Sequence, residues 1–438
     1  MKILYSRDEP LTAMQVGKII NRFQMQQLPK LMRWHNYYMG RQDILLKEPS
    51  DEGKPCYKIV TNFCKSIVDN YAGYLTGKPV TYGGDDTEDI LEVLRYNDVK
   101  TEDTNLLTSA LIFGVAFEVV YIDLDGEQRF KTLDPRECIP VYSDDLNEDL
   151  LYVIRFYKMD EVDEEKYTVE VYGPHECVRY RSGMGFTTFT FLEAVPNYYN
   201  QTPITVFPLN EEQESIFAQI MSLQDAYNTL MSASVEDYDA FADAYLLLKG
   251  IGADDDDIRQ MKQHRVMIMD SDATAEYLTK GTDGSRADSL MDRINDEIYK
   301  KSNCPDFTDE KFMSQSGVAI QYKLVGLENT ASVIESNMKK ALQKRIELIN
   351  SILNLTGEEV WRDVIIQFTR NLPDDISGIV DDINKLRGLV SDQTLLSQLP
   401  FIQDAEDEMQ RVQEEKRVAV YGVREVDLIA DEEEGTEA

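Results

Sequence analysis

Apolar residues recur every three or four positions in some parts of the chain and every second position in others. The first spacing is typical of amphipathic helices, and alternation is typical of half-buried strands. Helical spacing predicts helices over residues 12–39, 62–75, 86–96 and 101–113. Alternation predicts strands over residues 116–122, 128–133, 151–157, 167–172, 177–181, 187–192 and 205–209. We therefore expect a mixed α+β body that contains an antiparallel sheet.

The second half of the chain is mainly helical. Long helices are predicted over residues 211–241, 285–302 and 319–355, and a strand at 364–369 precedes helices at about 374–390 and 403–418. A short mixed segment, residues 242–284, separates the first two long helices and holds two apolar stretches, 244–248 and 265–269. Residues 421–438 form an acidic tail that we expect to be disordered. Two long helices that bracket a small insertion are typical of a projecting stalk.

Composition indicates an ordered protein without a membrane segment. Of the 438 residues, 42% are hydrophobic, and no apolar run approaches the roughly 20 residues that span a bilayer. The first residues lack the apolar core of a signal peptide, so we expect synthesis and assembly in a cytoplasm. The five scattered cysteines are expected to be free thiols in a reducing compartment.

The charge balance limits the ways in which the chain can meet nucleic acid. It carries 80 acidic and 45 basic residues, a formal net charge of −35. Tight general binding to DNA requires a basic surface, because counterion release supplies most of the affinity. Either there is no nucleic-acid partner, or DNA slides past the surface without adhering. Composition alone leaves both open.

Motifs for catalysis or metal binding are weak. His175 and Cys177 provide only two ligands, which is too few for a closed zinc site. The segment Gly73–Pro79 is one residue short of a phosphate loop and has proline where a magnesium-binding Ser or Thr should stand. The acidic run Asp254–Asp257 lacks the alternation of a calcium loop. We predict no catalytic residue, no metal and no cofactor.

Three segments resemble the portal proteins of long-tailed, siphophage-type bacteriophages. They are Asn62–Val80, which includes Gly-Tyr-Leu-Thr-Gly-Lys-Pro at 73–79, Asn303–Ala319, and Gly388–Asp404. Their order also matches, and the resemblance covers roughly residues 10–420. It implies a portal fold of class α+β, with a mixed wing, a two-helix stem, a small α/β clip, a long kinked helix and a helical crown.

The resemblance further implies a ring of twelve subunits at one capsid vertex, through which double-stranded DNA is packaged and ejected. The expected partners are a terminase motor, major capsid and scaffolding proteins, and a head-completion or adaptor protein, with no membrane. The expected segments are a wing (1–210), stem helix one (211–241), a clip (242–284), stem helix two (285–302), a channel loop (303–317), a long helix with the wing return strand (318–373), and a crown (374–420).

Individual residues follow from the same resemblance. The expected DNA-facing residues of the channel loop are Asp306, Asp309, Lys311, Ser314, Gln315 and Ser316. Lys300, Lys301 and Lys311 are candidates for basic rings in the channel, although cations are also favoured at any solvated helix end. The candidate clip strands contain Leu246, Leu247, Val266 and Ile268. These strands would pair either between neighbouring subunits, closing the ring, or within one subunit.

Two other classes remain as alternatives. A packaging ATPase or nuclease would need a genuine phosphate loop or a metal-binding carboxylate cluster. Another head structural or adaptor protein would have no evident use for a stem-like helix pair. The sequence favours a structural portal subunit over an enzyme.

Overall fold

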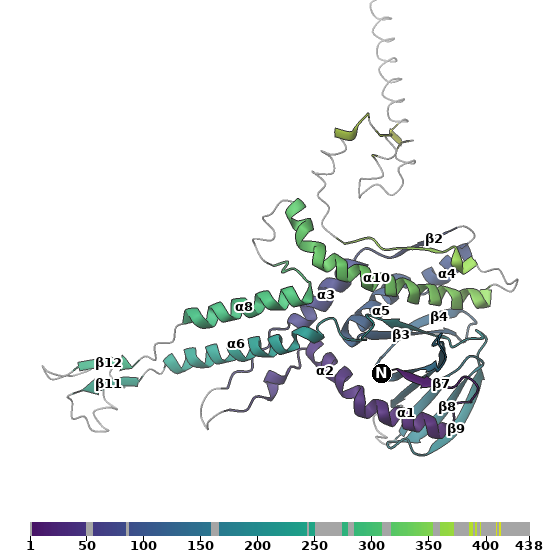
Figure 1. Ribbon diagram of the computed structural model, residues 1–438, viewed down its shortest axis with the longest axis horizontal. Helices are drawn as coiled ribbons and strands as arrows, with labels where there is room; N and C mark the ends of the chain where they lie inside the picture. Colours follow the sequence, from purple (N-terminus) through teal and green to yellow (C-terminus); the bar gives the residue numbers. More distant parts are fainter. Residues whose placement is uncertain are drawn as a thin grey trace, which may run out of the picture. The chain divides into compact units, whose positions relative to one another are not determined.

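The computed structural model divides into two compact units, Met1–Asn371 and Leu372–Ala438. The described residues of the first are 2–49, 56–84, 87–158, 166–242, 245–249, 274–278, 284–308, 317–353 and 360–371. In the second, a few positions between 385 and 412 are described, among them a parallel bridge between Arg387 and Val390. The expected crown therefore lies largely outside the described residues, and the acidic tail entirely so. All the helices, strands and contacts described below belong to the first unit (Figure 1).

The helices of the N-terminal part agree with the predicted ranges, with one exception. They are α1 (Ala13–Gln26), α2 (Leu28–Tyr38), the 3-10 turn η1 (Asp43–Leu46), α3 (Phe63–Thr76), α4 (Glu88–Tyr96) and α5 (Val99–Phe113). The prediction of one helix over 12–39 is wrong. Pro29 has no N–H, and its ring would clash with the carbonyl four residues earlier, so it is tolerated only in a first turn. A new helix consequently starts at Leu28.

Most strands fall into two sheets. The larger has the order β1-β5-β6-β7-β8-β9, in which β1 runs parallel to β5 and the other neighbours are antiparallel. Its strands are β1 (Ile3–Tyr5), β5 (Cys138–Ser143), β6 (Leu150–Lys158), β7 (Lys166–Tyr172), β8 (Glu176–Gly183) and β9 (Phe189–Pro196). The smaller, antiparallel sheet has the order β10-β3-β4, with β3 (Val115–Ile122), β4 (Gln128–Leu133) and β10 (Ile204–Pro208). The seven predicted strands are confirmed.

Two short strand pairs lie outside these sheets. β2 (Thr81–Gly83) pairs with β13 (Ile365–Gln367), which confirms the strand expected near 364–369 and follows the short turn η3 (Val360–Arg362). β11 (Tyr245–Lys249) pairs with β12 (Thr274–Leu278). The three long helices are α6 (Met221–Ala242), preceded by the turn η2 (Ala218–Ile220), α8 (Gly284–Ser302) and α10 (Gly317–Leu353).

The core lies where the two sheets face each other and where helices cover the smaller one. Side chains from both sheets form one buried cluster, which consists of Phe117, Val119, Leu133, Cys138, Val153 and Ile204. Helix α5 contacts β3, and α10 contacts β10 and α4. Gly114, with φ of 75°, ends α5 in the left-handed conformation and allows β3 to begin at the next residue. No helix in the described part of the chain is long and apolar enough to cross a bilayer.

Helix α10 changes direction between its first turns and the rest (Figure 1). Near this bend the Thr330 hydroxyl donates to the carbonyl of Gly326 at 3.2 Å. Such back-bonding from a threonine, next to a glycine without a side chain, is a known cause of bending in helices.

Candidate functional site

Helices α6 and α8 form a hairpin that projects from the sheets, with β11 and β12 paired beyond its end (Figure 1). At 1.5 Å per residue, the 22 residues of α6 span about 33 Å and the 19 residues of α8 span about 28 Å. β11 and β12 are antiparallel, with Leu247 opposite Glu276. The described chain thus has a stalk of two helices with a small β-hairpin at its tip.

The observed limits of this hairpin correct one expectation, and a second lies partly outside the described residues. Helix α6 begins at Met221, later than predicted, because Asn210 caps a loop: its side-chain amide oxygen accepts from the Glu214 N–H at 2.8 Å, and its Nδ2 donates to the Glu214 carbonyl at 2.9 Å. The apolar run at 244–248 is β11, as expected, but its partner is Thr274–Leu278, which the hydrophobic pattern did not mark. Leu246 and Leu247 lie in β11, while Val266 and Ile268 lie outside the described residues.

A row of polar side chains ties α6 to the extended segment before α3. Every fourth residue on one side of α6 accepts a hydrogen bond from the backbone N–H of every second residue of that segment. The acceptors are Gln224, Asn228, Ser232 and Glu236, and the donors are Phe63, Thr61, Ile59 and Tyr57, at 3.0, 3.0, 3.0 and 2.9 Å respectively. We call this set the polar ladder.

The hydrogen bonds of the ladder stay in register because four residues of α6 and two residues of the extended segment cover nearly the same distance. Four helical residues rise about 6 Å, and two extended residues advance about 6.6 Å. Gln42 adds to it, since its Oε1 accepts from Asn228 Nδ2 and its Nε2 donates to Asn62 Oδ1 at 3.2 Å. Sequence reasoning missed the ladder, although polar residues at four-residue spacing on a long apolar helix were its visible signal.

The base of the hairpin is fixed on α3. The ring of Phe63 meets those of Tyr227 and Tyr299 edge to face, with centroids 5.1 and 6.0 Å apart. Tyr71 donates its hydroxyl to the carbonyl of Ser302 at 2.9 Å, just where α8 ends. Burial raises the pKa of the next thiol, Cys304, to about 11, so it stays protonated at neutral pH. These contacts join both hairpin helices to the body.

The segment expected to face DNA is described only at its start. Asp306 Oδ1 accepts from the backbone N–H of Thr308 at 2.9 Å and from its hydroxyl at 2.6 Å, a local turn. Lys300 and Lys301 are exposed at the end of α8, and Lys300 Nζ lies 3.5 Å from Glu297 Oε1. The other expected loop residues lie outside the described residues; they are Asp309, Lys311, Ser314, Gln315 and Ser316.

The Gly73–Pro79 segment is a structural junction. Tyr74 donates its hydroxyl to Glu328 of α10 at 2.6 Å, and Arg370 donates two hydrogen bonds to the same carboxylate at 2.8 and 2.7 Å. Hydrogen bonds from Arg370 lower the pKa of Glu328 to about 2. A side chain at Gly77 would collide with the backbone carbonyl of Gly73 and with the side chain of Asn371, so glycine is required at the end of α3. The motif holds three segments together and does not form a phosphate loop.

A fully buried ion cluster fixes the other half of α10. Arg345 donates two hydrogen bonds of 2.7 Å to Glu118 of β3 and one of 2.6 Å to Asp103 of α5. Tyr82 donates its hydroxyl to Asp103 at 2.6 Å, and the guanidinium lies over the Phe130 ring. Burial acts to lower the pKa of Arg345, but the two carboxylates together raise it well above its usual range. Arg345 therefore stays charged inside the protein.

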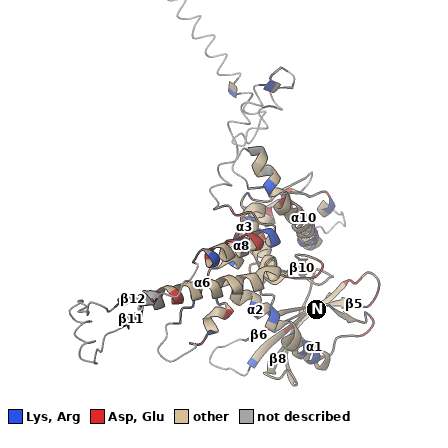
Figure 2. Ribbon diagram, turned by 60° about the vertical axis from the view of Figure 1, so that its left-hand side comes forward, with Lys and Arg blue, Asp and Glu red and all other residues tan. Residues whose placement is uncertain are grey.

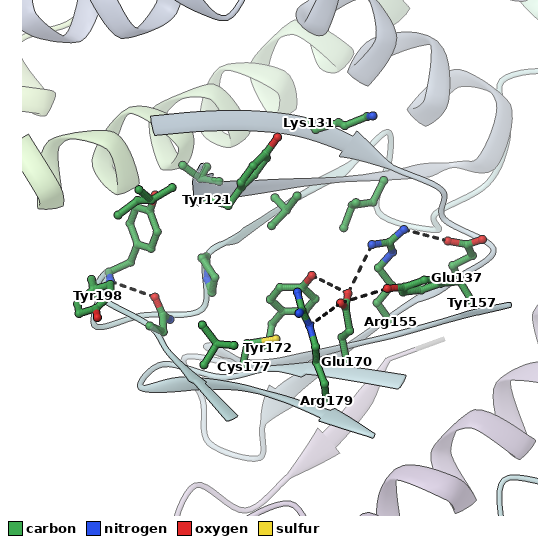
Figure 3. A pocket seen from close by; sticks show the side chains of 18 of the residues that line it. Tyr121, Lys131, Glu137, Arg155, Tyr157, Glu170, Tyr172, Cys177, Arg179 and Tyr198 are labelled. Carbon is green, nitrogen blue, oxygen red and sulfur yellow. Dashed lines mark hydrogen bonds and ion pairs between the residues drawn. The ribbon is translucent and has the colours of Figure 1, made fainter. Parts of the chain in front are cut away.

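A cavity of about 640 Å³ lies between the two sheets (Figure 3). At its centre the buried carboxylate of Glu170 accepts hydrogen bonds from both tyrosine hydroxyls and both arginines that surround it, at 2.8 Å from Tyr172, 3.0 Å from Arg179, 3.3 Å from Tyr157 and 3.4 Å from Arg155. Burial raises the pKa of Cys177 to about 12, so no thiolate nucleophile forms there at neutral pH. Among the described residues, no group of three or more side chains is placed to bind a metal ion.

Comparison with known proteins covers nearly the whole chain. The family described as "Phage portal protein, SPP1 Gp6-like" matches residues 17–420. The portal protein of Bacillus phage SPP1 is 24% identical over 444 aligned positions, which cover 93% of this chain and 87% of that protein. The portal protein of Clostridium phage phiCD119 is 22% identical over 424 positions, which cover 89% of this chain and 93% of that protein.

Proposed function

The chain belongs to the SPP1 Gp6-like family of phage portal proteins, and we propose from this membership which part each segment plays in the portal. A portal protein is a structural component of the virion that assembles as a ring of identical subunits, so this chain is a ring subunit and not an enzyme. The expectation of a portal from the three resembling segments is confirmed. The alternatives of a packaging enzyme or a shell or adaptor subunit are set aside.

We propose that the hairpin α6–α8 is the stem of the ring and that β11 and β12 belong to the clip. The observation that supports this most directly is the projecting helix pair with a β-hairpin at its tip (Figure 1). The wing would comprise residues 1–210, and 318–373 would add the long helix and the return strand. Residues 374–420 would form the crown. The clip would dock the terminase motor during packaging and the head-completion protein afterwards.

We propose that double-stranded DNA passes through a channel lined by the stem and by the loop at 303–317. A genome that moves in both directions requires weak, non-specific contact, and a net charge of −35 on each subunit provides a wall that repels phosphate. Lys300 and Lys301, exposed at the end of α8, would offset this repulsion locally, together with Lys311. Asp306 and the loop residues after it would line the narrowest part.

The surroundings follow from the same membership. We propose that twelve subunits assemble in the cytoplasm of a bacterial host together with scaffolding and major capsid proteins. The finished ring would occupy one vertex of the capsid. β11 and β12 pair with each other within one chain. We propose that their outer edges contact the clips of neighbouring subunits.

The first experiment is negative-stain microscopy of the purified chain together with native mass measurement of the same sample. Closed rings of about a dozen subunits with an open axial hole are the expected result. A monodisperse monomer or dimer at high concentration would contradict the proposed assembly. Shells or sheets would instead indicate a lattice subunit.

The channel lysines are tested in a packaging assay. We expect Lys300→Glu with Lys301→Glu to lower the yield of DNA-filled heads while leaving the mass of the ring unchanged. The matched control is Lys100→Glu with Lys131→Glu, two exposed positions on α5 and β4 that carry the same change in charge. Equal yields of DNA-filled heads from both double variants would contradict the proposal that Lys300 and Lys301 act in the channel.

A further inference from the structure

The surface of α1 and α2, up to Gln42 just before η1, has a charge opposite to that of the rest of the protein. From Pro10 to Gln42 the chain contains no Asp or Glu, although it carries 80 acidic residues in total. The same stretch contains basic residues that are all exposed: Lys18, Arg22, Lys30, Arg33 and Arg41. Lys30 and Arg33 form ion pairs with acidic residues of other segments of the same chain. A protein of such acidity thus keeps one elongated basic surface.

Large apolar side chains are exposed along the same elements. Met25 is 81% exposed, Met32 42%, Met39 51% and Leu46 79%. Met25 lies in α1, Met32 in α2, Met39 directly after α2, and Leu46 at the end of η1. Methionine is flexible and adapts to irregular partners, so exposed methionines are frequent at docking surfaces. We call these residues, with Lys18, Arg22 and Arg41, the basic face.

One flank of α8 carries a row of three aspartates, although the exposed Arg286 and Arg293 lie on the same helix. Helix α8 directs Ile294 and Ile298 into the core, while Asp288, Asp292 and Asp296 are exposed one turn apart along its outer side. Leu290, beside them, is 45% exposed. We call the three aspartates the acidic stripe. Figure 2 shows Lys and Arg positions on α1 and α2, and both acidic and basic positions on α8.

The two surfaces lie on different sides of one helix. Helix α6 contacts α8 on one side and η1 on another, where the ladder segment also binds it. In Figure 1, α8 and the purple turn η1 lie on opposite sides of α6. A ring of identical subunits needs two different contact surfaces on each copy, directed toward its two neighbours. The basic face and the acidic stripe satisfy this requirement.

We propose that, in the ring, the basic face of each subunit binds the acidic stripe on α8 of the next subunit. The proposal rests on the ring assembly described above. Copies that each carry −35 repel one another, and pairing a basic surface with an acidic one offsets that repulsion where the copies touch. Phosphates of DNA would also meet the lysines and arginines, but they would leave Met32, Met39 and Leu46 exposed to water. A protein partner buries both kinds of side chain.

The decisive experiment mixes two variants with reversed charges. The first carries Lys18→Glu, Arg22→Glu and Arg41→Glu, and the second carries Asp288→Lys, Asp292→Lys and Asp296→Lys. Each alone is expected to form at least about 10-fold fewer rings at low salt than the unmodified chain, by native mass and microscopy. An equimolar mixture is expected to recover rings in which the two variants alternate, because every contact then joins opposite charges.

Several outcomes would overturn the contact. Rings of normal yield from either variant alone, or no recovery on mixing folded variants, would do so. If the basic-face variant formed rings of unchanged mass but no longer bound short duplex DNA, the basic face would be assigned to DNA phosphates instead. The matched control, Lys100→Glu with Lys131→Glu and Lys340→Glu, changes the net charge equally at other exposed positions and should assemble normally. Absence of rings from the unmodified chain would overturn the ring assembly itself, and this contact with it.

A second measurement applies if either triple variant fails to fold by circular dichroism. Cysteines placed by Arg41→Cys and Asp292→Cys in one chain should give a ladder of disulfide-linked multimers under mild oxidation. Cys64, Cys138 and Cys304 are buried, and the half-exposed Cys56 and Cys177 are replaced by serine in every chain tested, so each single variant and the parent chain should give none. Rings of the double variant that gave no disulfide-linked multimers would overturn the contact.

Discussion

Helices α10 and α6 are both held to the body by polar groups, but in opposite ways. Arg345 of α10 places a full charge in the core, where two carboxylates and one tyrosine hydroxyl surround it and no atom of its side chain reaches solvent. Helix α6 uses neutral amides, a hydroxyl and one carboxylate to accept backbone N–H groups along a partly exposed segment. Helix α10 is held by one buried charge, whereas α6 is held by hydrogen bonds distributed over several helical turns.

The two joints should respond differently to the loss of one side chain. A buried ion pair gains little net stability when complete, because desolvation offsets attraction, but losing one partner leaves a buried charge without compensation. Each neutral hydrogen bond of the ladder has a modest net effect, and the loss of one side chain leaves a few polar groups without a partner but no unpaired buried charge. The α10 joint should therefore fail as a unit, whereas the α6 joint should weaken step by step.

Removing the central charge is expected to have the largest effect. Arg345→Met leaves Glu118 and Asp103 buried without their cation, and we expect the free energy of unfolding to fall by about 3–5 kcal/mol. Urea denaturation followed by the fluorescence of Trp34 and Trp361 measures it. A triple variant that adds Glu118→Leu and Asp103→Leu removes every ionised group and should recover most of the loss. A single variant that costs less than about 1 kcal/mol would contradict the all-or-none character of this joint.

Breaking one rung of the ladder should cost less. Asn228→Ala removes the acceptor of the Thr61 N–H and of Gln224 Nε2, which donates to it at 3.1 Å, and removes the donor to Gln42. We expect a loss of about 1–3 kcal/mol. The matched control is Thr229→Ala at the adjacent exposed position, whose hydroxyl bonds only within its own helix; it should change stability by less than about 0.5 kcal/mol. Loss of the whole α6 fold in Asn228→Ala would show that the rungs do not act independently.

Sequence patterns predicted elements where one face of a helix or strand is buried. Strands β3, β4 and β6 to β10 and helices α3 and α8 lie close to their expected ranges. Strand β5 was missed because five of its six residues are buried, so apolar and polar positions do not alternate. The break at Leu28 was missed because apolar spacing continues through Pro29, and only the missing N–H shows that a new helix starts there.

The polar joints were harder to predict, since they depend on partners distant in sequence. Arg345 stands among apolar residues of α10, and nothing nearby shows that Asp103 and Glu118 come to it from other elements. The ladder donors are backbone N–H groups, which carry no sequence signal at all. The family resemblance, by contrast, rests on short motifs such as Gly73–Pro79, whose role in joining α3 to α10 becomes clear only in the fold.

The upper end of α10 provides an intermediate case, a half-exposed ion pair whose effect depends on pH. Arg370 lowers the pKa of Glu328 from the usual 4.5 to about 2, so the folded state binds this proton less tightly than the unfolded state. Its contribution is present above pH 4.5 and is lost as pH falls toward 2. We expect Glu328→Gln to cost about 1 kcal/mol at pH 7, a small value because solvent screens the pair, and almost nothing at pH 2. Urea denaturation of both proteins at several pH values measures the difference, and a constant difference would contradict this assignment.

The smallest effect is expected at the last rung, where the ladder itself carries a charge. Glu236 accepts from the Tyr57 N–H at 2.9 Å and also pairs with Lys47 Nζ at 2.6 Å. If the ladder works through acceptors for backbone amides, Glu236→Gln keeps the essential bond and loses only a partly exposed ion pair, at a cost of about 0.5 kcal/mol. Glu236→Ala removes both and should cost about 1 kcal/mol or more. Denaturation of the two variants side by side separates the contributions. If glutamine proved as costly as alanine, charge would stabilise this rung, and α6 would resemble α10 more closely than the rest of its ladder indicates.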